Sequence, residues 1–199
     1  MDSTDVSHNQ RPTTALSHVE NHKQSFIESL KNCVANRSKY ERWTRAIEVL
    51  ESDPVFEAAK IKKLVNLNSS KEQSNCEKTF GRLSSGHKIV LLTITRLVES
   101  VEEKTLVLLD EPETHLHPPL LSSFIRALSE LLINRNGVAI LTTHSPVVLQ
   151  EVSKDCVWKL SRFGSLSKAE RPTIETYGEN VSRLISEVFE LEVTRSGFH

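Results

Sequence analysis

Glycine and cysteine are both scarce in this sequence, and no long apolar segment is present. None of the six glycines begins or ends a GxxxxGK[ST] loop, so a phosphate-binding loop of that type is absent. The three cysteines, Cys33, Cys76 and Cys156, are odd in number and lack CxxC spacing. This argues against a disulfide framework or a cysteine zinc site and favours a reducing environment. No stretch approaches the ~18 apolar residues of a membrane helix, and the polar N-terminus lacks the apolar core of a secretory signal. We therefore expect a cytoplasmic chain with no membrane partner.

The overall charge and composition are those of an ordinary globular protein. The formal net charge of -1 gives no bulk electrostatic reason to expect binding to nucleic acid or to an anionic surface. With 199 residues, the chain is long enough to bury the core of one compact domain.

The sequence divides into a flexible tail (1–17), a helical arm (18–77) and a lobe (78–199). In the arm, apolar residues recur at helical spacing, at Phe26, Ile27 and Leu30 and again at Trp43, Ile47 and Leu50. We interpret the arm as two or three amphipathic helices, and a solvated hairpin without chemistry is the favoured interpretation. Leu67–Lys78 reads as a polar loop.

The lobe alternates helices and short apolar runs, which indicates an α/β fold. We predict helices after Ser84, over Pro119–Leu132 and near Glu179–Leu191, and strands at Leu106–Leu109, Val138–Leu141 and Val157–Leu160. Strand, helix and strand at this spacing predict right-handed crossovers in a parallel sheet. The unbroken apolar character of the first strand predicts that both of its faces are buried.

Two adjacent carboxylates, Asp110 and Glu111, follow the first strand directly. Ligands of open α/β sheets bind at the carboxyl ends of the strands, so this pair is placed where a metal-bound phosphate would be handled. Asp110 can hold Mg²⁺ through its oxygens, and Glu111 can orient a water for attack on phosphorus. Taken alone, an acidic turn without chemistry explains the pair equally well.

Two further segments favour the phosphate hypothesis. Ser84, Ser85 and Gly86 precede a long helix, where free backbone N–H groups and the helix dipole form an anion site. The same residues are also ordinary N-cap material. His144 directly follows the second strand and can donate a hydrogen bond to a terminal phosphate oxygen.

A histidine pair lies in the proline-bounded loop after the carboxylates. His115 and His117 are only two residues apart, and no third ligand lies nearby in sequence. We therefore favour backbone positioning and contact with a partner surface over a zinc site.

In order, Leu83–His87, Leu106–Pro112 and Thr142–His144 resemble the signature motif, Walker B strand and switch histidine of ATP-binding-cassette (ABC) ATPases. The strings DEPETHLHP and TTHSP resemble the non-transporter branch. That branch includes recombination and chromosome-maintenance ATPases, overcoming-lysogenization-defect nucleases and Septu-type anti-phage ATPases. The resemblance covers roughly residues 78–160, and the closing segment looks most similar to the Septu type. It implies a P-loop-NTPase-like parallel sheet, with residues 78–199 as the C-terminal lobe of an ATPase head.

The resemblance also implies cofactors and residue roles. ATP and Mg²⁺ would be the cofactors. Asp110 would support Mg²⁺, Glu111 would act as the general base or water-orienting carboxylate, and His144 would sense the γ-phosphate.

A second group of residues would act across a dimer interface. Ser84, Ser85 and Gly86 would bind the γ-phosphate of ATP held by the opposing subunit. Leu116 and His117 would occupy the D-loop position, which crosses that interface.

The sequence departs from the pattern of the class in two ways. The usual signature has glycine at the position of Ser85 and often glutamine or an acidic residue at that of His87. The larger departure is the missing GxxxxGK[ST] loop, together with the N-terminal strands that carry it. The resemblance then implies a fragment, one half of a split ATPase, or a decayed gene product.

Two functions remain open at this stage. The first is ATP binding and hydrolysis in nucleic-acid surveillance or anti-phage defence, as a homodimer or paired with a Walker A-containing chain. A nuclease and DNA would be further partners. The alternative is a non-enzymatic regulatory or interaction fragment that pairs with a complete ATPase. The chain itself has neither a further carboxylate cluster nor HNH-like spacing for a nuclease.

Overall fold

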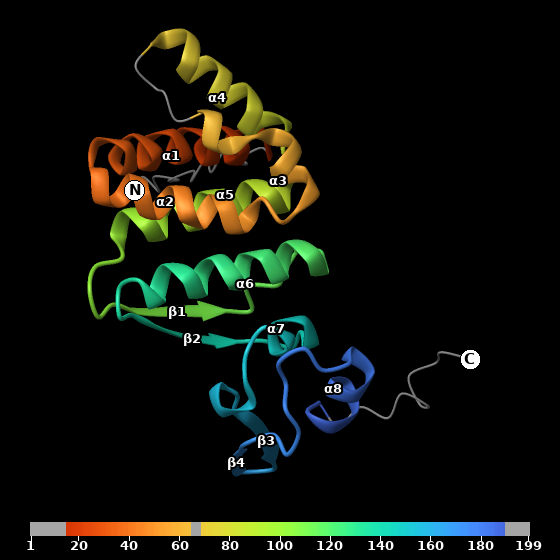
Figure 1. The fold of residues 1–199 in the computed structure, drawn as a ribbon. Coiled ribbons are helices and arrows are strands. Elements are labelled where there is room, and N and C mark those ends of the chain that lie inside the picture. The colour runs from red at the N-terminus through yellow and green to blue at the C-terminus, as the bar shows by residue number, and fades with distance from the viewer. Residues whose placement is uncertain (1–14, 65–68, 190–199) are drawn as a thin grey trace, which may run out of the picture.

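The computed structural model describes residues 15–64 and 69–189, and it shows a mixed α/β protein dominated by helices (Figure 1). The N-terminal half is helical, with elements α1 (Ala15–Ala35), α2 (Arg37–Leu50), α3 (Pro54–Ala59), η1 (Ile61–Leu64), α4 (Ser70–Arg82) and α5 (Ser85–Ser100). The C-terminal half comprises β1 (Leu106–Asp110), α6 (Pro118–Ile133), β2 (Val138–Thr142), α7 (Pro146–Gln150), η2 (Lys154–Cys156), β3 (Lys159–Phe163), β4 (Leu166–Glu170) and α8 (Val181–Glu187). None of the described helices has the length and apolar character needed to cross a bilayer.

Helix α4 occupies most of the segment predicted as a polar loop, so that prediction is wrong. Ser69 and Glu72 form a capping box, in which each side chain accepts a hydrogen bond from the other residue's backbone N–H. Cys76 and Phe80, four residues apart, form the buried face of the helix. Phe80 stacks on Phe26 of α1 with ring centroids 4.7 Å apart. The cap and two buried side chains stabilise a helix whose remaining residues, apart from Gly81, are polar.

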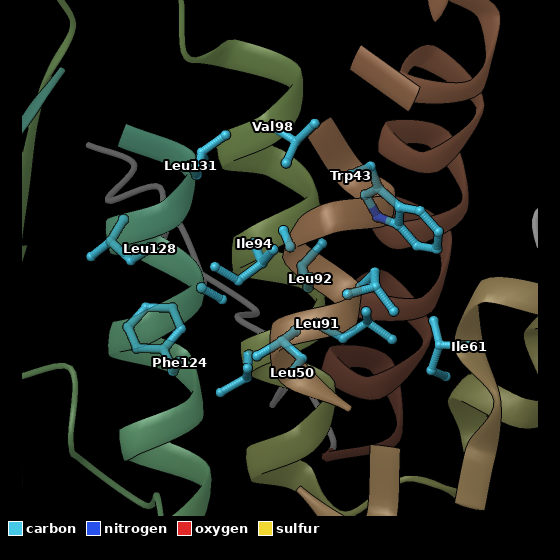
Figure 2. Packing of buried hydrophobic residues seen from close by; sticks show 14 of the residues in the cluster. Trp43, Leu50, Ile61, Leu91, Leu92, Ile94, Val98, Phe124, Leu128 and Leu131 are labelled. Atoms are coloured by element: carbon cyan, nitrogen blue, oxygen red, sulfur yellow. The ribbon is translucent and has the colours of Figure 1, made fainter. Parts of the chain in front are cut away.

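One hydrophobic cluster extends from the helical half to the helix that covers the sheet. Helix α1 packs on α5, and α2 packs on α6. Figure 2 shows side chains from α2, α5 and α6 meeting in this core. Trp43 of α2 is fully buried, and its Nε1–H donates to Oγ1 of Thr95 in α5 over 3.0 Å. The boundary predicted after residue 77 falls inside α4, and the division into arm and lobe stays a prediction.

The predicted parallel pair is confirmed. Strands β1 and β2 are parallel, with Leu106 opposite Val138 and Asp110 opposite Thr142. Helix α6 makes the crossover and lies against one face of the pair (Figure 1). Both strands therefore end at the same edge of the sheet, where the functional residues were predicted.

The other face of this sheet is exposed, which contradicts the prediction that both faces of the first strand are buried. The exposed fraction is 56% for Leu106, 69% for Leu108, and 59% for both Val138 and Ile140. The alternate residue Val107 faces the core and is buried. The apolar pattern of these strands suits a sheet covered on both faces, but in the described part of the chain only α6 covers it.

The third predicted strand does not join this sheet. Strand β3 begins two residues later than predicted and pairs antiparallel with β4. Gly164 lies at the turn between them with a φ of 61°, a conformation that glycine adopts readily. The final predicted helix corresponds to α8, while most of the predicted tail and residues 190–199 lie outside the described residues.

Candidate functional site

The ends of β1 and β2 are joined by hydrogen bonds that fix the first carboxylate. Thr142 Oγ1 donates to Oδ1 of Asp110, directly opposite in the register. The backbone N–H of Glu111 in turn donates to the Thr142 carbonyl over 3.1 Å and contacts its hydroxyl at 3.2 Å. The carboxylate pair is thus held at the edge where both strands finish.

The second carboxylate meets the predicted switch histidine. Nε2 of His144 lies 3.3 Å from Oε1 of Glu111, and both side chains are largely exposed, by 82% and 51%. Glu111 has a φ of 42°, a left-handed conformation that turns the chain sharply at the end of β1. Three predicted site residues, Asp110, Glu111 and His144, are therefore brought together from two strand ends.

Glu113 supports this arrangement, although sequence reasoning gave it no structural role. Its Oε1 accepts from the backbone N–H of His144 over 2.6 Å and from the Thr143 hydroxyl over 2.8 Å. Its Oε2 is buried and has no hydrogen-bond partner among the described residues. Its position as the second glutamate of Asp-Glu-Pro-Glu is the sequence feature from which this supporting role could have been predicted.

The predicted signature residues lie at the start of α5. Ser84 is the N-cap, and its Oγ lies 3.4 Å from the backbone N of His87 and 2.6 Å from Nδ1 of the same residue. Ser84 and Ser85 are exposed. Gly86 is buried, and a Cβ placed on it would lie 3.1 Å from the carbonyl oxygen of His115 and 3.3 Å from Cδ2 of Leu116. A side chain at this position would therefore require the His115–Leu116 segment to shift slightly.

The predicted D-loop residues pack against this helix start. Leu116 is half-buried over Gly86. His117 is the N-cap of α6, with Nδ1 accepting from the backbone N–H of Leu120 over 3.3 Å. The structure thus brings Ser84–Gly86, Leu116 and His117 into a second cluster. Within the described ranges, no hydrogen bond or ion pair links this cluster to Glu111 or His144.

The second cluster contains a buried pair that sequence reasoning missed. His87 and Asp53 are 3% and 2% exposed, and Nε2 of His87 lies 3.0 Å from Oδ1 of Asp53. One ligand atom from each of Asp53, His87 and His117 lies within 4.8 Å of the others. Hydrogen bonds already engage both ring nitrogens of His87 and Nδ1 of His117. These contacts account for the cluster without a metal ion.

The cysteines do not contribute to either cluster. Burial raises the pKa of Cys33 and of Cys76 to about 12, so both thiols stay protonated near neutral pH. Cys156 is exposed. All three cysteines are free in the structure.

Comparison with known proteins identifies curated relatives, among them a phage protein and a bacterial retron protein. The chain is 49% identical to Protein ea59 of Escherichia phage lambda over 191 residues, covering 87% of this chain and 36% of that protein. It is 28% identical to the Retron Vc95 probable ATPase of Vibrio cholerae over 148 residues, covering 69% of this chain and 28% of that protein. The chain thus spans about a third of the length of these relatives.

A protein family also matches most of the chain. Its description is "AAA domain, putative AbiEii toxin, Type IV TA system", and the match covers residues 10–150. This range includes both clusters of candidate site residues and the parallel strands β1 and β2. It also includes the hydrophobic cluster that extends from the helical half to α6. The chain belongs to this AAA-domain family.

Proposed function

We propose that this chain supplies the Walker B, signature and switch-histidine part of an ABC-class ATPase head, which binds and hydrolyses ATP when a Walker A-containing segment is added. The observation that carries this proposal is the 3.3 Å contact between His144 and Glu111 at the paired ends of two parallel strands. That edge is where phosphate ligands of α/β sheets bind.

The residues of this edge fit one side of a Mg-ATP site. Asp110 and Glu111 are exposed and offer the hard oxygen atoms that Mg²⁺ prefers. Bound Mg-ATP would supply an electrophilic phosphorus and a metal that neutralises phosphate charge. Asp110 would hold the metal side, Glu111 would orient the attacking water, and His144 would donate to a terminal phosphate oxygen. The backbone cradle for the β-phosphate is not encoded in this sequence.

The exposed face of the β1–β2 pair supports a missing covering segment. Leu106, Leu108, Val138 and Ile140 form a contiguous apolar face that water would otherwise solvate. A Walker A-containing segment, in the same polypeptide or in a second one, would bury this face. The same contact would bring the phosphate-cradling loop to the edge with Asp110 and Glu111.

The test is to reconstitute the head and measure phosphate release. A GxxxxGK[ST]-bearing segment from a relative that has this loop is fused to the chain, and Glu111→Gln is compared with the parent. The substitution keeps the shape but removes the water-orienting carboxylate, so turnover should fall by about 10²-fold or more, with ATP affinity within a few-fold of the parent. The matched control is Glu103→Gln, which removes an exposed carboxylate from the loop before β1. Turnover of Glu111→Gln within a few-fold of the parent would contradict the proposal.

A second candidate is a non-enzymatic interaction fragment that pairs with a complete ATPase. The missing GxxxxGK[ST] loop and the open apolar face favour it. In that case the chain would bind a complete head and alter its turnover, and Glu111→Gln in this chain would leave that effect unchanged.

The biological setting is proposed from the relatives. The family description reads "putative AbiEii toxin, Type IV TA system", and one relative is named "Retron Vc95 probable ATPase". We propose a role in anti-phage defence or nucleic-acid surveillance, with a homodimeric or paired head and with a nuclease and DNA as partners. Septu-type ATPases are the proposed nearest branch.

A further inference from the structure

Ser84, His87 and Asp53 form a continuous chain of polar contacts from the protein surface into the core. Ser84 Oγ lies 2.6 Å from Nδ1 of His87, and Nε2 of His87 lies 3.0 Å from Oδ1 of Asp53. Ser84 is exposed, whereas the other two side chains are almost completely buried. Asp53 is also fixed as the N-cap of α3, since its Oδ1 accepts from the backbone N–H groups of Val55 and Phe56.

The positions of the protons in this chain determine what Ser84 can offer a ligand. The Asp53 carboxylate only accepts, so Nε2 of His87 must carry a proton. In neutral His87, Nδ1 then has a lone pair, and the 2.6 Å contact requires the Ser84 hydroxyl to donate inward. In protonated His87, Nδ1–H donates to Ser84 Oγ instead. Only in this second state is the serine proton free to point outward.

We propose that the Asp53–His87 pair is a positioning device that controls whether Ser84 can donate a hydrogen bond to the phosphate in trans. Docking of the phosphate is accompanied by uptake of one proton from solution at Nδ1 of His87. The Ser84 O–H bond is not broken, and only the direction of its hydrogen bond reverses. This inference rests on the proposed function, because it assumes that Ser84 meets a nucleotide held by another subunit.

Two ionisable side chains and one aromatic ring lie against the imidazole. The ionisable groups that the described structure places against the ring are Asp53, from the α2–α3 junction, and His117, whose ring centroid is 5.3 Å away. Phe56 of α3 meets the ring edge-on at 5.0 Å. The buried carboxylate thus faces Nε2 of the ring at 3.0 Å. His117 Nδ1 faces the Leu120 N–H with a lone pair, which places any ring proton of its neutral form on Nε2.

The experiment measures ATP-driven dimerisation of the reconstituted head against pH on a Glu111→Gln background, which traps the bound state. The dimerisation constant is determined by analytical ultracentrifugation with Mg-ATP between pH 6 and pH 8.5. Dimerisation of the parent should weaken as pH rises, with up to about tenfold loss per pH unit for each linked proton, and a symmetric dimer has two such protons. His87→Gln keeps a donor for Asp53 but cannot take up a proton. The loss of dimerisation that His87 causes as pH rises should therefore disappear, and dimerisation at high pH should exceed that of the parent.

Asp53→Asn is the matched second variant. Asparagine caps helices as well as aspartate does, and its oxygen can still accept from His87 Nε2–H. Only the negative charge that stabilises the imidazolium is lost, so the pH range of dimerisation should shift downward. Equal pH slopes in the parent and His87→Gln, or no shift in Asp53→Asn, would overturn the proposal. Other histidines, including His144, contribute equally to all three proteins.

Nuclear magnetic resonance of ¹⁵N-labelled histidine separates this inference from the proposed function. If the Glu111→Gln head stays monomeric with Mg-ATP at every pH, the proposed function is wrong. The proton positions are then determined in the folded chain itself. A proton on Nε2 of neutral His87 at high pH, with protonation of Nδ1 at low pH, supports the device. A neutral ring protonated on Nδ1 overturns it. Urea unfolding curves verify that each variant is folded.

Discussion

Gly86 lies so close to Leu116 that a methyl group added to the glycine would come within 3.3 Å of the leucine Cδ2. The carbonyl oxygen of His115 would be closer still, at 3.1 Å. The start of α5 and the loop before α6 therefore fit against each other without spare room. The signature and D-loop segments of the proposed head are coupled by direct packing.

Gly86→Ala should destabilise the chain by about 1–3 kcal/mol, because overpacking displaces the His115–Leu116 backbone. The control is Gly81→Ala in α4, where an added Cβ meets nothing within 4 Å. That change should be neutral or stabilise the protein by up to about 1 kcal/mol, through improved helix propensity. Urea unfolding measures both. Equal effects of the two substitutions would contradict the packing argument.

Glu113 should position His144 without acting as the base. Glu113→Gln retains an oxygen that can accept from Thr143 and from the His144 N–H, so turnover of the reconstituted head should stay within a few-fold of the parent. Glu113→Ala removes both contacts, and we expect turnover to fall roughly tenfold or more, as for loss of other second-layer contacts. If Glu113→Gln abolishes turnover as completely as Glu111→Gln does, Glu113 is the base.

The open sheet face should matter for pairing and not for the fold of this chain. Leu108→Lys changes a side chain that is 69% exposed, so the free energy of unfolding should change by no more than about 0.5 kcal/mol. Pairing with the Walker A-containing segment, supplied as a separate polypeptide and measured by calorimetry, should be lost. Val107→Ala, on the buried face, should instead destabilise the chain by about 2 kcal/mol. Undiminished pairing of Leu108→Lys would show that the segment docks elsewhere.

The sequence predicted the elements whose signals are local. The parallel pair, α5 and α6 follow from apolar runs and caps, and the meeting of Glu111 with His144 follows from adjacency of parallel strand ends. Helix α4 could not be predicted from its polar composition, because its signals are limited to the Ser69–Glu72 capping box and two buried side chains.

The buried Asp53–His87 pair could not be predicted in the same way. Its members are 34 residues apart and belong to segments that were assigned to different parts of the chain. Only the packing of the α2–α3 junction on α5 brings them together. In the sequence, the position of His87 in the signature motif is the one indication of its role.

The placement of α5 has a mechanical consequence. This helix carries Ser84 at its N-terminus, and its 16 residues extend about 24 Å through the middle of the protein. Its side chains pack against those of α1, α2 and α6 along that length, and close-packed interiors transmit displacement instead of absorbing it. A displacement of Ser84 would therefore shift α5 together with α1, α2 and α6. A change at the N-terminus of α5 would in this way reach its C-terminus.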